Sequence, residues 1–442
     1  MKKNKDFSNM YINYEKNQRR RRGGRGWKVF LVILLAAAFG IGTFLLVSKQ
    51  IDLDKYDNHD NLDNQDDLIL ADNEPEEEDL EAEVTLEPTP EAIPEPTPES
   101  KVEKEEDPRV PVRVKGLYAS ASVASNEDKI SALIEVAETT EINALVIDVK
   151  DDDGRITYAM DSEFAQSIGA TTNVINDMEA LVNRLKDKGI YTIARIVAFK
   201  DPHLAESRHD LAIKNRDGSL YRDTNGECWV NPYLHEVWDY LIEVSEQAAH
   251  IGFDEIQFDY IRFSTGRGMS EVDFGEGAAE KDKEDIIVEF TQYAYEKLKP
   301  LGVFVSADVY GAIITSSIDA GLVGQNYVEM SKHLDYICPM IYPSHYGDGN
   351  YGVEHPDLEP YKLIRRALED SQKKLDVIPE GEHRAIVRPW LQDFTASWLR
   401  NYKSYGPLEI RDQIGGVYAA GYKEWLFWNA SGNYTIEAFN EE

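Results

Sequence analysis

Cysteine is nearly absent from this 442-residue chain, which contains only Cys228 and Cys338. Two cysteines that lie so far apart in the sequence form neither a disulfide framework nor a zinc site. We therefore expect two buried thiols, with one long-range disulfide as the alternative. The histidines at positions 203, 209, 235 and 250 also lack the H-E-x-x-H spacing of a zinc enzyme. The sequence thus predicts no metal site and no cofactor.

Basic residues are also scarce, with 47 Lys and Arg against 81 Asp and Glu and a formal net charge of -34. A polyanion such as DNA or RNA would be repelled by this charge, which excludes nucleic acid as a partner. The charge is unevenly distributed, because basic residues gather in residues 1–28 and acidic residues in 51–107.

Only one apolar run is long enough to cross a membrane, and it covers residues 27–47, WKVFLVILLAAAFGIGTFLLV. About 20 helical residues span the ~30 Å hydrocarbon layer. The basic segment 1–26 comes before this run and an acidic segment follows it, so we expect the N-terminus in the cytoplasm and the rest of the chain outside. The prediction is a single-pass signal-anchor in the cell membrane. A cleaved signal peptide is the alternative, although its apolar region usually has only ~7–15 residues.

Residues 48–113 are rich in Asp, Glu and Pro and contain the near-repeat EPTPEAIPEPTPE. Such a segment buries too little apolar surface to offset the entropy lost on ordering. We predict a disordered acidic linker that holds the following domain away from the membrane.

Residues 114–442 alternate short β-rich runs with helical patterns, which predicts a parallel sheet with crossover helices. Helices are expected over Glu127–Thr139, with Ser125 as candidate N-cap, and over residues 234–250. Eight such units predict an α/β fold, a (β/α)8 TIM barrel. The alternative is a doubly wound open sheet, but no glycine-rich phosphate turn follows the first run. The eight runs are KGLYAS (115–120), ALVIDVK (144–150), YTIARIVAF (191–199), EIQFDYIRF (255–263), VFVSADVY (303–310), YICPMIY (336–342), AIVRPWLQ (385–392) and EWLFWNA (424–430).

The active site of such a barrel lies at the carboxyl ends of its strands, where side chains two residues apart share a face. The predicted strand ends carry polar and aromatic residues where a core built for stability would have Val, Ile and Leu. Acids of this kind can do acid–base work, while aromatic rings stack on sugars and polar groups bond hydroxyls. The candidate catalytic residues are Asp259, Asp308 and Asp148, and the candidate substrate-binding residues are Arg195, Gln257, Tyr342, His345, Arg388, Trp390, Gln392, Trp428 and Asn429.

Glycoside hydrolysis needs two carboxyl groups, one as proton donor and one as nucleophile or base. Asp259 and Asp308 end adjacent predicted strands, so we expect them to face each other, with Asp259 as nucleophile or base and Asp308 as proton donor. Asp148 is the substitute donor if Asp308 instead forms an ion pair with Arg195.

Four segments together resemble a family of glycoside hydrolase-like domains once catalogued as a domain of unknown function. They are WVNPY (229–233), GFDEIQFDYIRF (252–263), PMIYPSHY (339–346) and RPWLQDF (388–394). The resemblance covers residues 114–432 and implies a carbohydrate-active (β/α)8 barrel in which Asp259 matches the nucleophile that ends the fourth strand of several such enzymes. Chitinase-like enzymes match less well, because Asp259 is followed by Tyr260 and Ile261 instead of leading to a D-x-D-x-E glutamate.

Several of these residues also have plain structural interpretations. Asp148 could neutralise Lys150, residues 151–154 fit a solvated turn better than a calcium loop, and Glu255 is expected at the solvated bottom of the barrel. For the whole chain, the sequence favours a membrane-anchored hydrolase of an extracellular polysaccharide or cell-wall glycan. The alternative is a non-catalytic, glycan-binding barrel that acts as a wall-associated scaffold, and a metal-dependent hydrolase is the weakest alternative.

Overall fold

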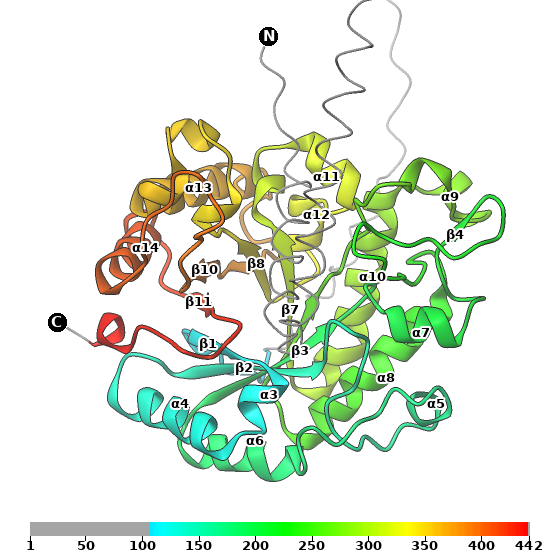
Figure 1. Ribbon diagram of the computed structural model, residues 1–442, viewed down its shortest axis with the longest axis horizontal. Helices are drawn as coiled ribbons and strands as arrows, with labels where there is room; N and C mark the ends of the chain where they lie inside the picture. The colour runs from blue at the N-terminus through cyan, green and yellow to red at the C-terminus, as the bar shows by residue number, and fades with distance from the viewer. Residues whose placement is uncertain (1–106, 441–442) are drawn as a thin grey trace, which may run out of the picture. The chain divides into compact units, whose positions relative to one another are not determined.

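The computed structural model describes residues 107–440, which form a closed barrel of parallel strands surrounded by helices (Figure 1). The tail 1–26, the membrane anchor 27–47 and nearly all of the linker 48–113 lie outside the described residues. None of the helices within residues 107–440 combines the length and apolarity that a membrane span requires.

All eight predicted strands are present, so the prediction of a (β/α)8 barrel is confirmed. Neighbouring strands pair in parallel in the order β10-β11-β1-β2-β3-β5-β7-β8-β9. The barrel strands are β1 (Lys115–Ala119), β2 (Ala144–Lys150), β3 (Tyr191–Val197), β5 (Glu255–Asp259), β7 (Phe304–Tyr310), β8 (Tyr336–Met340), β9 (Ile386–Val387), β10 (Trp390–Gln392) and β11 (Trp425–Trp428). A separate antiparallel pair joins β4 (Lys214–Asn215) to β6 (Val272–Asp273).

The seventh barrel strand is divided into β9 and β10, and this division lies at the closure of the barrel. Pro389 has no N–H to donate to a ladder, and it separates the two short pieces. β9 pairs with the start of β8, while β10 pairs with Met340 at the end of β8 and with β11. The sheet has no open edge here, so the doubly wound alternative is wrong.

The helices follow the strands and pack around the outside of the barrel (Figure 1). They are α3 (Ala121–Ala124), α4 (Glu127–Thr139), α5 (Glu163–Ser167), α6 (Met178–Asp187), α7 (Pro202–Ser207), α8 (His235–Ile251), α9 (Gly277–Glu280), α10 (Lys283–Leu298), α11 (Ser317–Val323), α12 (Tyr327–Ser331), α13 (Pro360–Leu375) and α14 (Pro407–Ala419). α4 has its predicted bounds, but its N-cap is Asn126 and not Ser125. The Asn126 side chain accepts a hydrogen bond from the Lys129 N–H, which satisfies one of the free donors of the first turn.

Both cysteines are buried free thiols, as predicted, and the alternative of a long-range disulfide is wrong. Cys338 lies inside the barrel, where its sulfur is 3.5 Å from the Gln257 Nε2. Burial raises the pKa of this thiol well above its usual value, so it stays protonated and adds no charge to the barrel interior.

The lower part of the barrel interior holds a buried ionic cluster around Arg388. Its Nη1 lies 2.9 Å from each carboxylate oxygen of Glu255, and its Nε lies 3.1 Å from Glu424. Its guanidinium also stacks 3.6 Å from the centre of the Tyr336 ring. Both Arg388 and Glu255 are completely buried, so Glu255 is not solvated as predicted. Arg388 is bound to the base of the barrel and is not placed to bind substrate at the rim.

We predict that Arg388→Met destabilises the domain by about 3–5 kcal/mol, because it leaves the Glu255 carboxylate buried without its counter-charge. The measurement is urea unfolding followed by tryptophan fluorescence. The double variant Arg388→Met/Glu255→Met should recover part of the loss, since of the two carboxylates only Glu424, which still accepts from the Val114 N–H, is then left without its counter-charge. Arg365→Met, at an exposed pair with Glu369, is the control and should cost no more than about 0.5 kcal/mol. Equal effects of the two single substitutions would contradict the prediction.

Candidate functional site

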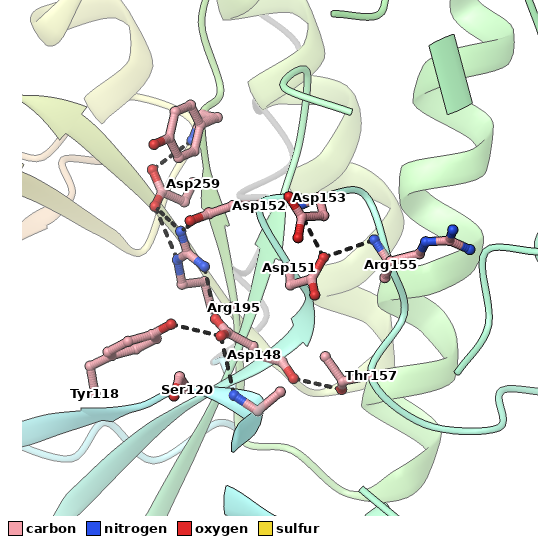
Figure 2. Close-up of polar contacts among 12 residues, drawn as sticks. Tyr118, Ser120, Asp148, Asp151, Asp152, Asp153, Arg155, Thr157, Arg195 and Asp259 are labelled. Atoms are coloured by element: carbon pink, nitrogen blue, oxygen red, sulfur yellow. Dashed lines mark hydrogen bonds and ion pairs between the residues drawn. The ribbon is translucent and has the colours of Figure 1, made fainter. Parts of the chain in front are cut away.

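The carboxyl end of the barrel is organised around the guanidinium of Arg195, which comes from β3 and is 1% exposed. Its Nη1 donates to Asp148 at 2.8 Å, and its Nη2 donates to Asp259 at 2.6 Å and to Asp152 at 2.8 Å. Figure 2 shows Arg195 between Asp259 and Asp148, with Asp152 beside it. One buried cation therefore holds three carboxylates that would otherwise repel one another, of which Asp148 and Asp259 are buried and Asp152 is partly exposed.

Asp259, the last residue of β5, is fixed by three hydrogen bonds. Its Oδ2 accepts from the Nε and Nη2 of Arg195, at 3.0 and 2.6 Å. Its Oδ1 accepts from the N–H of Tyr260 at 2.6 Å. Tyr260 has φ of 51°, a left-handed conformation that is uncommon outside glycine. The backbone bends sharply after Asp259, and such outliers are frequent at functional sites. The two guanidinium N–H donors and the backbone N–H therefore fix the orientation of the Asp259 carboxyl group.

Asp308 of β7 has a different environment, although it is the neighbour of Asp259. The last pair in the β5–β7 register is Phe258 with Ala307, which places Asp259 and Asp308 one residue further along their strands. Asp308 is 2% exposed, and its Oδ1 accepts from the indole N–H of Trp390 at 2.7 Å. Burial, assisted by the negative charge of Asp259, raises the pKa of Asp308 well above its usual value. Arg195 forms ion pairs with other aspartates instead of Asp308, so the alternative of a structural Asp308–Arg195 pair is wrong.

Asp148 of β2 is buried on the far side of Arg195. Its Oδ2 accepts from the Tyr118 hydroxyl at 2.6 Å, and burial raises its pKa. It does not neutralise Lys150, because the β2–β3 register shifts between these two residues. Lys150 instead lies 2.8 Å from Asp201, which contradicts that interpretation. The ion pair with Arg195 makes Asp148 a weaker candidate for the donor than Asp308.

Aromatic side chains line the mouth beside these carboxylates. The Trp428 ring stacks on Tyr118 with centroids 3.9 Å apart and lies 5.4 Å from the Arg195 guanidinium carbon. Tyr342 and His345, whose ring centroids are 5.2 Å apart, lie in the segment that follows β8. Burial lowers the pKa of His345 to about 3, so its imidazole is neutral at physiological pH. These positions suit four of the predicted substrate-binding residues, since Trp390 also lies here beside Asp308.

Three other predicted substrate-binding residues either form hydrogen bonds with neighbouring loops or are completely buried. Gln392 accepts from the Ser344 N–H and donates to the Phe394 carbonyl and to Asp357. Asn429 donates to two backbone carbonyls and accepts from Ser431. Gln257 is completely buried below Asp259. Together with Arg388, these residues show that a polar residue near a strand end can belong to a loop anchor or a lower layer.

The sequence-based prediction missed Asp152, Tyr118 and Tyr260. Asp152 belongs to the predicted solvated turn 151–154, and that turn exists, with the Asp151 carboxylate accepting from the N–H groups of Asp153 and Arg155. Figure 2 shows the Asp152 side chain directed to Arg195 while Asp151 points to the turn. Because the side chains of Asp151 and Asp152 point in different directions, one acid of the turn could have been expected to face the site. Tyr118 could have been found from its place near the end of β1.

Further missed residues lie beyond the ends of β3 and β5. The Arg262 guanidinium lies 4.7–5.0 Å from the ring centres of Trp229, Tyr260 and Tyr310. Lys200 is 3.4 Å from Glu227. Within residues 107–440, no group of three or more His, Cys, Asp or Glu side chains has an arrangement that could hold a metal ion.

A closed parallel barrel with aspartates and aromatic rings at the carboxyl ends of its strands has the architecture of carbohydrate-active barrels. A family match of the sequence identifies one family within this class of barrels. Residues 116–434 match the family described as "Putative glycosyl hydrolase domain", and the chain belongs to that family. The resemblance deduced from the four sequence segments is therefore confirmed.

Comparison with solved structures gives one similar fold with a TM-score above 0.5 and two weaker likenesses. The glycoside hydrolase domain of PgaB (BpsB) from Bordetella bronchiseptica has a TM-score of 0.54 and 12% identity over 75% of this chain and 100% of its own. A hypothetical protein from Ruminiclostridium thermocellum is 38% identical over 44% of this chain and 97% of its own, with a TM-score of 0.41. The endo-1,4-beta-D-mannanase of Thermotoga petrophila has 14% identity over 74% of this chain and 97% of its own, with a TM-score of 0.47. No curated protein sequence matches the chain significantly.

Proposed function

We propose that this chain is a glycoside hydrolase that cleaves a polysaccharide or cell-wall glycan, with Asp259 as the nucleophile and Asp308 as the proton donor. One observation carries the proposal: two buried aspartates lie at matching positions near the ends of neighbouring strands and have different electrostatic environments. Asp259 accepts from Arg195 and from a backbone N–H. Asp308 accepts from a neutral indole and has a raised pKa. Two carboxyl groups in such different environments are the usual basis for dividing acid and nucleophile roles.

The proposed reaction begins with Asp308 in its protonated form. It donates its proton to the glycosidic oxygen as the bond from that oxygen to the anomeric carbon breaks. A carboxylate oxygen of Asp259 bonds to the anomeric carbon and forms a glycosyl-enzyme intermediate. Asp308, now ionised, then accepts a proton from the water that hydrolyses this intermediate. Strands ~4.8 Å apart with their aspartates at the same level favour the ~5–5.5 Å separation of retaining enzymes over the wider spacing of inverting ones.

The aromatic and cationic groups of the mouth complete the proposal. Trp428 and Tyr342 would pack against sugar rings, and His345 would contact hydroxyl groups as a neutral imidazole. Arg195 would act through Asp259, keeping it ionised and oriented while the positive charge of the transition state develops beside it. Asp148 would hold Arg195 from the opposite side.

The same proposal includes a location outside the cell. The support is the apolar run 27–47 between a basic segment and an acidic one, which orients a signal-anchor with its C-terminal side out. The catalytic domain would then meet extracellular glycans while staying attached to the membrane.

Asp259→Asn is expected to reduce polysaccharide hydrolysis by at least about 10³-fold, because the amide can neither attack the anomeric carbon nor act as a base. The measurement is reducing-sugar release from a panel of bacterial and plant polysaccharides, with binding of the same glycans measured in parallel. Binding should persist, since the amide keeps the size of the acid. Asp187→Asn, at an exposed position on α6, is the matched control. An Asp259→Asn variant with full activity would rule out the proposed nucleophile.

Trp390→Phe tests the role of Asp308 through pH. The indole N–H favours the ionised form of Asp308 and so lowers its pKa. Removing this donor should raise the pKa further, and the alkaline limb of kcat/KM, where the donor loses its proton, should move to higher pH. Trp238→Phe, which removes an indole bond to the Pro232 carbonyl elsewhere, should leave the limb in place. A limb that moves to lower pH in Trp390→Phe would exclude Asp308 as the donor.

The orientation is tested by adding protease to intact cells that produce the full chain. The expected result is loss of the barrel domain from the cells while a cytoplasmic marker protein stays intact. Cleavage within the predicted linker should release the domain into the medium before the domain itself is degraded. A barrel that resists protease until the cells are lysed would show that the predicted orientation is wrong.

A further inference from the structure

The loop between β10 and α14 carries a row of aromatic residues that begins at the barrel mouth. Phe394 follows β10 directly, and its ring centroid lies 6.2 Å from Tyr342 and 6.4 Å from His345. Trp398 stacks on Phe394 from further along the loop, with centroids 6.0 Å apart and an angle of 23° between the ring planes. The row thus leads from two buried residues of the candidate site to a ring at the surface.

Trp398 is 36% exposed, while the other tryptophans within residues 107–440 are buried or half-buried. Tyr402, on the same loop, is 45% exposed. A large aromatic side chain gains free energy when it is removed from water. Exposed aromatic residues beside a candidate active site therefore indicate a surface that a ligand covers.

The loop is held in place at both ends, so Trp398 does not lie on a loose segment. The Phe394 carbonyl accepts from the Gln392 side chain at 2.9 Å. The Tyr405 N–H donates to the Thr395 hydroxyl at 3.0 Å, which ties the two ends of the loop together. The Lys403 N–H donates to Asp357 at 3.0 Å. A loop that is already ordered loses little conformational entropy when a ligand binds to it.

We propose that Trp398, supported by Phe394, binds a pyranose ring of the glycan at a position outside the catalytic pair. The C–H face of the sugar would pack on the indole, and the chain would run from there past Tyr342 to Asp259 and Asp308. This inference rests on the proposed function and adds a requirement to it, that the substrate is a polymer with several sugar rings in contact with the protein.

The size of the surface favours a sugar over a protein partner. A stable protein interface buries about 800 Å² on each partner, far more than one loop with two exposed aromatic rings provides. A pyranose ring, in contrast, is about the size of the indole. Continuity with the mouth also fits a chain whose other rings reach the catalytic residues.

The test uses the full-length chain with Asp259→Asn, so that bound glycan is not cleaved. Retention is measured on immobilised β-mannan, glycol chitin and purified peptidoglycan. Trp398→Ala in this background should weaken retention about tenfold on each polymer that the parent binds. Trp398→Phe should restore most of it, because the ring is kept. In the active chain, Trp398→Ala should lower kcat/KM on the polymer and leave hydrolysis of a short aryl glycoside nearly unchanged.

Val377→Ala is the matched control, since Val377 is 68% exposed and follows α13 at the opposite end of the barrel. Unchanged retention in Trp398→Ala, equal losses in Trp398→Ala and Val377→Ala, or a parent chain that binds none of the three polymers would each overturn the inference. An Asp259→Asn chain that still cleaves glycan would refute the proposed nucleophile, and the binding comparison would still decide the role of Trp398.

Discussion

The charge of one buried guanidinium, that of Arg195, makes the arrangement at the mouth of the barrel possible. Its Nη1 donates to Asp148, and its Nη2 donates to both Asp152 and Asp259. Carboxylates this close together would otherwise repel one another, and the repulsion is strongest for the two that are buried, Asp148 and Asp259. Arg195 is the residue type suited to the task, because its planar fork offers several donors and keeps its charge when buried. The orientation of the Asp259 carboxyl group depends on it.

The contrast between Asp259 and Asp308 follows from which groups Arg195 can reach. Arg195 forms an ion pair with Asp259 and none with Asp308 on the next strand. Asp308 instead accepts a hydrogen bond from the neutral indole of Trp390. Burial and, to a lesser extent, the charge of Asp259 raise the pKa of Asp308, while the charge of Arg195 lowers it. The proton on Asp308 is thus favoured mainly by burial and by its neighbour on the next strand. This coupling is the physical core of the proposed acid and nucleophile pair.

The fold could be predicted closely from the sequence, because each barrel strand is a short apolar run with a helix after it. The site could be predicted only in part, since an alternating pattern tells which face a side chain takes but not which layer it occupies. Asp259 and Asp308 lie at matching positions on neighbouring strands, as expected, and their roles stay predictions, whereas Arg388 lies with Glu255 in the lower layer. The pairing of Lys150 with Asp201 depended on a register shift in β2 that no composition signal reveals.

The lower layer also acts on the upper one through charge. Glu255 is neutralised in part by Arg388, yet its charge still contributes to the raised pKa of Asp308. Asp308 therefore lies between two anions, Asp259 beside it and Glu255 below, in a region that water hardly reaches. Purely apolar packing beneath Asp308 would remove this charge, but it would keep the carboxyl group buried, and burial is the largest cause of its raised pKa. The buried ionic cluster, costly for stability, is therefore a minor contributor to the raised pKa of Asp308, and the main contributor is the exclusion of water around it.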